Sequence, residues 1–200
     1  MVKIRYYLLF IFPAFFATSC SVNEDVIYSI ASADGDIVSQ WPYSKSGLNI
    51  HVRPDNTTVN RRSTRILGLP VETVAKTEGL IARPFKVYIA VKKGSGFNAS
   101  WEPAKTSLIY DRKKMTPVEL TYVNLIALED DCFISKSGFQ EGAVELEDEY
   151  YVCISAEFDI ETINPSENFK LELFGLTRNG EALEPIVLDF NGVQYKSVKF

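Results

Sequence analysis

Short runs of apolar and β-branched residues, separated by turn-forming residues, recur along this 200-residue chain. The clearest run is Phe85–Val91, in which every second residue is a large apolar one, and comparable runs cover 48–52, 107–110, 150–158 and 169–173. A period of two places such residues on one face of a strand. Because no stretch has the spacing of a long helix, the sequence predicts an all-β fold with little helix, an antiparallel β-sandwich of immunoglobulin-like or transthyretin-like type.

Three stretches in the middle of the chain carry more local predictions. Arg53–Arg65 is basic and contains turn-forming residues, which indicates a loop within an irregular N-terminal part of the fold. Pro70–Glu78 precedes a glycine and is interpreted as one or two helical turns. Val118–Leu128 is apolar on both of its alternating faces, which favours a central strand that is covered on both sides.

The end of the chain contains a strong hairpin signal. Asn191-Gly192 lies between two strand-like runs, Pro185–Phe190 and Val193–Phe200. Asparagine and glycine tolerate the positive φ that a two-residue turn between antiparallel strands requires. The sequence therefore predicts a terminal β-hairpin that turns at this dipeptide.

The first residues have the composition of a secretory signal peptide. Lys3 and Arg5 give a positive start, and an apolar run follows over Tyr6–Phe16. The small residues Ala17-Thr18-Ser19 come next, directly ahead of Cys20. The apolar run has 11 residues and contains a proline, whereas a helix that spans a bilayer needs about 20 apolar residues. We therefore interpret residues 1–19 as a signal peptide.

The sequence Ala17-Thr18-Ser19-Cys20 resembles the end of a bacterial lipoprotein signal, whose motif closes with small residues and a cysteine. The resemblance covers only these first residues, and it implies that Cys20 becomes the lipid-modified N-terminus. By the same resemblance, Ser21 lets a lipoprotein of Gram-negative bacteria proceed to the outer membrane. The implied location is the bacterial cell envelope, on either face of that membrane. The alternative is an ordinary signal peptide or an apolar anchor.

Removal of residues 1–19 leaves 181 of the 200 residues, enough for one large domain or two small ones. The polar and acidic residues 20–26 are interpreted as a lipidated tether. Residues 27–200 are then predicted to form a single β-sandwich domain. The alternative is two small β domains that divide near residue 115.

The cysteines also indicate an exported protein. If Cys20 carries lipid, Cys132 and Cys153 remain. An even pair in an oxidising compartment predicts a disulfide, here between neighbouring strands because each cysteine lies in an extended stretch. The alternative is two buried free thiols.

Charge is divided unevenly along the chain. Residues 45–114 contain 14 basic and 5 acidic side chains, whereas residues 115–191 contain 3 basic and 17 acidic ones. The net charge of the mature chain is −7, which argues against nucleic acid as a partner. The two segments could meet as interleaved strands, as opposite poles of one molecule, or as surfaces of successive copies.

Two groups of residues are candidates for binding. Basic residues that gather at one end of the fold would form a patch for an anionic partner, such as lipid phosphate or an acidic envelope polymer. These candidates are Arg61, Arg62, Lys92, Lys93, Arg112, Lys113 and Lys114. Phe97 and Trp101 lie on a glycine-containing loop and are predicted to be partly exposed, the alternative being that Trp101 closes the core.

No arrangement of residues is typical of a catalytic or metal site. His51, the one histidine, lies on the polar side of a strand and is interpreted as exposed. The acidic runs Glu129–Asp131 and Glu145–Glu149 are interpreted as solvated faces. We expect a membrane-anchored binding or assembly module for a protein partner or an anionic envelope component, without cofactor, metal or enzymatic activity. The alternative is an envelope enzyme, or an accessory to one, that acts on glycans.

Overall fold

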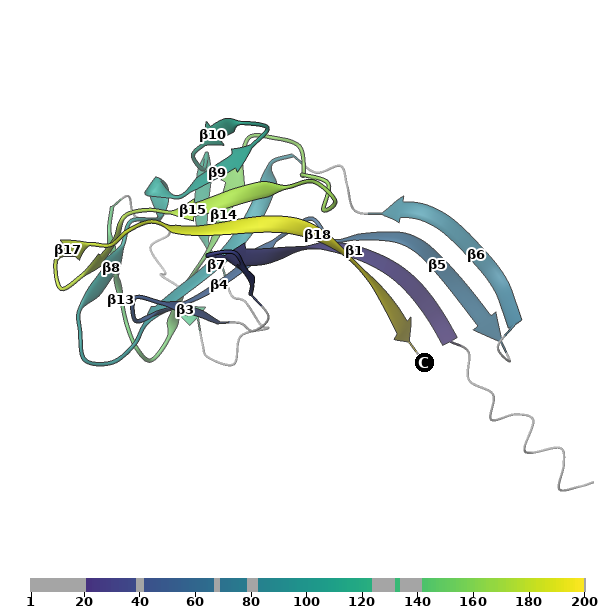
Figure 1. Ribbon diagram of the computed structural model, residues 1–200, viewed down its shortest axis with the longest axis horizontal. Coiled ribbons are helices and arrows are strands. Elements are labelled where there is room, and N and C mark those ends of the chain that lie inside the picture. Colours follow the sequence, from purple (N-terminus) through teal and green to yellow (C-terminus); the bar gives the residue numbers. More distant parts are fainter. Residues whose placement is uncertain are drawn as a thin grey trace, which may run out of the picture. The chain divides into compact units, whose positions relative to one another are not determined.

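A computed structural model of the chain describes residues 21–38, 42–66, 69–78, 83–123, 132–133 and 142–199. These residues form antiparallel sheets that pack in a sandwich-like arrangement (Figure 1). The predicted all-β sandwich is therefore confirmed. In the part of the chain that the structure describes, no helix is both long enough and apolar enough to cross a membrane.

The largest sheet has eight strands in the order β10, β9, β15, β18, β1, β5 and β6, with β2 paired to β1. The strands in the first half of the chain are β1 (Ser21–Ala33), β2 (Asp36–Ile37), β5 (Thr58–Ile66) and β6 (Leu69–Glu78). Those in the second half are β9 (Ser107–Tyr110), β10 (Lys113–Met115), β15 (Phe169–Leu173) and β18 (Ile186–Lys199). Among the described strands, the first and the last are thus neighbours in the middle of this sheet.

A second sheet has six strands in the order β11, β14, β7, β4 and β3, with β12 paired to β14. Its strands are β3 (Tyr43–Lys45), β4 (Leu48–Pro54), β7 (Phe85–Lys93), β11 (Glu119–Tyr122), β12 (Cys132–Phe133) and β14 (Tyr151–Phe158). A small third sheet runs β13 (Val144–Leu146), β8 (Ala99–Trp101), β16 (Leu176–Arg178) and β17 (Glu181–Ala182). A short 3-10 helix covers Pro103–Lys105.

Aromatic side chains join the two larger sheets in the core. Phe85 on β7 packs edge-to-face against Phe169 on β15, with ring centroids 5.6 Å apart. Phe169 in turn stacks on Phe190 of β18 at 4.7 Å. Phe85 is fully buried, as its place in the alternation of Phe85–Val91 predicts. Burial of each such side chain contributes about 1.5–3 kcal/mol to folding, so this cluster holds the sheets together.

The chain divides into two compact units. The larger comprises Tyr28–Thr57 and Gly79–Val193, and the smaller comprises Met1–Ile27, Thr58–Glu78 and Gln194–Phe200. In the smaller unit β5 pairs antiparallel with β1 on one side and with β6 on the other.

The N-terminal third is more regular than the sequence indicates. β1 begins at Ser21, inside the stretch interpreted as a tether, and β5 occupies most of the stretch interpreted as a loop. The helical turns predicted for Pro70–Glu78 are wrong, because β6 is a strand. Its valines and threonines favour extended backbone, and pairing with β5 supplies the hydrogen bonds that a polar strand needs.

The strand predicted over Val118–Leu128 is not central in the part that the structure describes. β11 stands at the end of its sheet order and pairs only with β14 there. Val118, next to it, is 66% exposed. Apolar residues on both faces therefore do not mark a central strand here, and residues 124–128 lie outside the described part.

The predicted terminal hairpin is also wrong. β18 runs from Ile186 to Lys199 and includes Asn191-Gly192, and Figure 1 draws it as one long strand. The glycine serves a different purpose, because the backbone of 165–166 lies so close that no side chain fits at 192. Packing between segments has overridden the local turn preference. A tight turn does form at Asn179-Gly180, between β16 and β17, and both of its residues have positive φ.

Candidate functional site: a cleft between two strand edges

A cleft of about 490 Å³ opens in the larger unit between β1 of one sheet and β4 of the other. Its walls are residues 28–31 of β1 and residues 51–54 of β4. Asn56 and Thr57, on the connection from β4 to β5, also line the cleft. Side chains of a strand alternate between its faces, so a cleft that touches consecutive residues of both strands lies along the strand edges.

The β1 edge has no described strand partner along the cleft, and at the end of this stretch the carbonyl of Ala31 is bonded to Val38. β5 pairs with β1 only up to Ile27, and β2 pairs with it only from Ser32 onward. Among the described strands, none pairs with this edge between those two points. The amide of Val38 donates to the carbonyl of Ala31 over 2.9 Å, so the backbone groups of Ala31, and of Ser29 two residues earlier, point towards this edge.

The β4 edge is uncovered in the same way. β3 pairs with β4 only up to Ile50, and no other described strand is in register with the outer edge of residues 51–54. On the inner side, the amide of Asp55 donates to Lys86 of β7 over 2.9 Å. Backbone groups of successive residues point in opposite directions, so those of Val52 point outward, and so does the carbonyl of Pro54. A proline suits this position because its missing N–H lies on the unpaired side.

The cleft has an apolar floor and a basic rim. Phe190, Val52 and Ala31 line it and are almost fully buried. Arg53 is exposed, with its guanidinium 5.2 Å from the centre of the Tyr88 ring. None of the described residues that line the cleft is acidic. Such a site can take an apolar group together with a hydrogen-bonded or negatively charged one.

His51 also lines the cleft and is half-buried, so the expectation of a simply exposed histidine does not hold. Burial lowers the pKa of His51 below its ordinary value, and the positive charge of Arg53 lowers this pKa further. The imidazole therefore favours its neutral form, and the permanent positive charge at the rim is that of Arg53.

The two lysines on β7, Lys92 and Lys93, contact side chains of their own chain. The Lys92 ammonium lies 4.9 Å from the centre of the Tyr151 ring. The side chain of Lys93 is only 12% exposed and lies 3.9 Å from the Asp148 carboxylate. Neither lysine is presented as part of an open basic surface.

The basic turn between β9 and β10 lies near the start of β7, whereas Lys92 and Lys93 lie at the end of β7. Ile109 is in register with Lys170 near the start of β15, beside Phe169, which packs on Phe85 at the start of β7. Lys92 lies seven residues further along β7, about 23 Å away at 3.3 Å per residue. The two clusters therefore do not gather into one patch.

Arg112 and Lys113 are exposed at this turn, and Lys114 is paired. The Lys114 ammonium donates to the Glu172 carboxylate over 2.6 Å, and this bond lowers the pKa of Glu172. Lys114 comes from the basic segment of the chain and Glu172 from the acidic one. Pairs of this kind indicate that interleaved strands neutralise part of the charge division.

The third basic cluster belongs to the smaller unit. Arg61 and Arg62 are on β5, and their side chains lie outside the described ones. By backbone register they stand opposite Asp25 and Glu24 of β1. Cross-strand partners of opposite charge attract, so this register again places basic residues against acidic ones.

The predicted exposure of Trp101 is wrong, and the alternative holds. Trp101 is fully buried on β8, in register with Leu176 on one side and Val144 on the other. The glycine-containing loop ends before Ala99, where β8 begins. Strand pairing on both sides brings the indole into the core.

Phe97 does lie on the loop and is half-buried, but its ring is occupied within the chain. The Arg178 guanidinium lies 4.4 Å from the ring centre. A side chain at Gly47 would come within 2.9 Å of the same ring. The amide of Asn179 also donates to the carbonyl of Asn98 over 2.8 Å. Phe97 therefore fixes three loops to one another.

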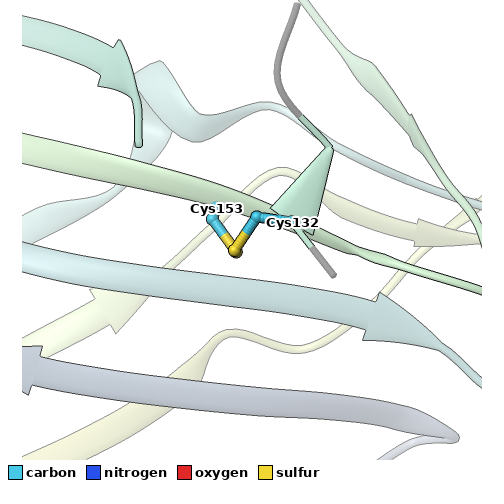
Figure 2. Close-up of a disulfide and its surroundings, with 2 residues drawn as sticks. All are labelled: Cys132 and Cys153. Atoms are coloured by element: carbon cyan, nitrogen blue, oxygen red, sulfur yellow. A yellow bond between two sulfur atoms is a disulfide. The ribbon is translucent and has the colours of Figure 1, made fainter. Parts of the chain in front are cut away.

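The predicted disulfide is confirmed. Cys132 on β12 and Cys153 on β14 are bonded, with Cα atoms 5.6 Å apart (Figure 2). The two strands are parallel neighbours, with Cys132 in register with Tyr151. Cys153 is fully buried against Ala90 and Tyr151. The disulfide therefore attaches β12 to the sheet.

Several predicted features lie outside the described residues or at the surface. Cys20 and the acidic run Glu129–Asp131 are outside the described part of the chain. Glu145 and the residues from Glu147 to Glu149 are exposed, as expected of a solvated face. Among the described residues, no group of three histidine, cysteine or acidic side chains could hold a metal ion.

No protein family, curated protein or solved structure matches this chain. The cleft itself was missed at the level of sequence. The signal that could have indicated it is Pro54 at the end of the alternating run 48–52, since proline within a sheet is confined to edges and strand ends. Its position predicts that one side of β4 has no strand partner.

Proposed function

We propose that this protein is a lipid-anchored envelope lipoprotein that acts as a binding or assembly module, and that the cleft between β1 and β4 holds its partner. The observation that carries the proposal is the pair of uncovered strand edges that face the cleft. Unpaired edges template further pairing and are ordinarily blunted or covered. A partner that fills the cleft would cover both.

A protein partner is favoured over an anionic polymer. The basic clusters on β7 and at the β9–β10 turn are far apart, and Lys93 and Lys114 already lie beside carboxylates. A polymer of repeated negative charge would find no continuous basic track there. The cleft instead combines apolar walls with a few polar groups, which is typical of a specific binding site.

The anchoring part of the proposal rests on the first twenty residues of the sequence. Metabolic labelling with a clickable fatty acid tests it. We expect wild type to be labelled and a Cys20→Ala variant to lose the label. Equal labelling of both proteins would refute lipidation at this cysteine.

The binding part is tested by site-specific photo-crosslinking in the native membrane. A benzophenone amino acid replaces Thr57, which is exposed at the cleft. The matched control carries it at Glu184, which is also exposed but does not line the cleft. We expect a discrete crosslinked protein from position 57 alone. Equal adducts at both positions, or none at 57, would contradict binding at the cleft.

A further inference from the structure

We propose that the occupant of the cleft is an extended peptide segment of a partner protein. This segment adds as a strand to the outer edge of β4, places an apolar side chain in the cleft and sets a carboxylate near Arg53. The inference rests on the proposed function, because it names the chemical class of the partner. Strand addition at an open sheet edge is a general mode of peptide recognition.

The backbone of β4 presents the groups that such a strand requires. Val52 points both its N–H and its carbonyl outward, as the hydrogen bond from Asp55 to Lys86 fixes by alternation. An antiparallel neighbour exchanges two hydrogen bonds with one such residue. Pro54 offers a carbonyl and no donor, so the added strand needs no acceptor opposite it. Residues 51–54 provide an edge of about 13 Å.

The cleft then receives the side chains of the added strand. Every second side chain of a strand at this edge points to the interior face of the sheet, where Val52 and Phe190 lie. A volume of about 490 Å³ is enough for a large apolar side chain and part of the backbone. On the opposite wall, Ser29 lies on the β1 edge beside Ala31, whose carbonyl accepts from the amide of Val38. An extended chain can therefore contact both walls at once.

Charge complementarity gives the sequence preference of the peptide. Arg53 is exposed at the rim, and no described residue that lines the cleft carries a negative charge. His51 favours its neutral form, so Arg53 is the positive charge that a carboxylate meets at the rim. Asp55 follows directly beyond the end of β4 and disfavours a second carboxylate there. The peptide is thus apolar and acidic, with its carboxylate placed at Arg53.

The test uses the full-length protein as its host processes it, reconstituted in lipid nanodiscs. A displayed library of random ten-residue peptides is selected on wild type and, in parallel, on a Thr57→Trp variant whose indole fills the cleft. Because Thr57 is exposed, we expect this variant to fold as wild type does. Its circular dichroism spectrum and its unfolding midpoint verify this. We expect peptides enriched only on wild type to alternate apolar residues with Asp or Glu.

The most enriched peptide is then synthesised in two forms, one with N-methyl groups on alternate residues along one edge and one without. Fluorescence polarisation measures their affinities. Methylation of the edge that pairs with β4 should weaken binding by about tenfold or more, because it removes donors to the strand. Arg53→Glu should weaken binding by about tenfold or more, whereas the charge reversal Arg112→Glu, at an exposed residue that does not line the cleft, should leave the affinity unchanged.

Several results would overturn the inference. These are enrichment on both proteins, enriched peptides that are basic or lack alternation, and equal binding of the methylated and unmethylated forms. Absence of any enriched peptide, together with a crosslink from position 57 in the membrane, would refute an extended peptide as occupant and leave the binding function standing. A crosslink to a second copy of this chain through a folded surface would have the same meaning.

Discussion

The side-chain amide of Asn56 donates a hydrogen bond of 2.8 Å to the hydroxyl of Ser29. The same amide nitrogen lies 3.2 Å from the carbonyl of Ile163. Asn56 is only 1% exposed. One buried amide therefore connects β1, the segment after β4 and the segment after β14, at the end of the cleft.

Replacement of Asn56 by alanine should lower the free energy of unfolding by about 1–3 kcal/mol, since it leaves a half-buried hydroxyl and a buried carbonyl without their donor. Urea unfolding followed by circular dichroism measures the change. Asn49→Ala is the control, because the Ser44–Asn49 hydrogen bond is exposed and its loss should cost less than about 1 kcal/mol. Similar losses in the two variants would show that the buried bridge has no special role.

Gly192→Ala should also destabilise the protein. A Cβ at 192 would lie 2.7 Å from the Cα of Ser166 and still closer to the carbonyl oxygen of Pro165. Both are backbone atoms, so relief requires the segment to move, at a cost of about 1–3 kcal/mol. The neighbouring exposed residue gives the control, Asn191→Ala, which should be near neutral. A wild-type melting temperature for Gly192→Ala would mean that the segment at 165–166 yields easily.

The disulfide should contribute substantially to stability. Cys132 and Cys153 are separated by 21 positions, and closing a loop of this size is worth about 3 kcal/mol in the chain-entropy description. Cys132→Ala should lower the free energy of unfolding, measured with urea, by about this amount. Reductant should bring wild type to the same midpoint and leave the variant where it is. A variant as stable as oxidised wild type would contradict the prediction.

Stability should depend on pH through His51. Burial lowers the pKa of His51 in the folded protein below the ordinary value of 6.5 that applies to the unfolded chain. Between the two pKa values the unfolded chain binds more protons, so the free energy of unfolding falls as the pH drops below 6.5. The fall ends once the folded imidazole is protonated as well.

The measurement is the urea midpoint of wild type and of His51→Gln across this pH range. The variant lacks the titrating group, so its midpoint should fall less on acidification than that of wild type. The carboxylates contribute equally to the pH dependence of both proteins, so their effect cancels in the comparison. Parallel pH profiles would show that His51 titrates alike in the folded and unfolded states.

The sequence predicted the strands whose pairing and burial follow a regular local pattern. Phe85–Val91 and Phe169–Leu173 alternate because one face meets the core, and the structure places both as strands. β5 contains several arginines and no such pattern, and it is a strand because β1 and β6 pair with it on both sides. That cause is non-local, so no window of sequence contains it.

The same distinction separates the predicted site residues from the site. Two cysteines can be paired by counting, and Cys132–Cys153 was predicted correctly. The exposure of Trp101 depends on what β16 and β13 place beside it. The cleft depends on where β3 and β5 stop pairing with their neighbours. The residue at which two strands stop pairing is set by the whole sheet. The local sequence indicates it only weakly, as Pro54 does on β4.

The adjacency of β1 and β18 has a consequence for biosynthesis. These strands are the first and the last described in the chain, and they lie side by side in the middle of the eight-stranded sheet. A chain made or exported from its N-terminus cannot complete that sheet until its final residues have emerged, because contacts of such large sequence separation form only when both partners are present. Until then, the edge of β1 that later faces β18 stays unpaired and open to chaperones.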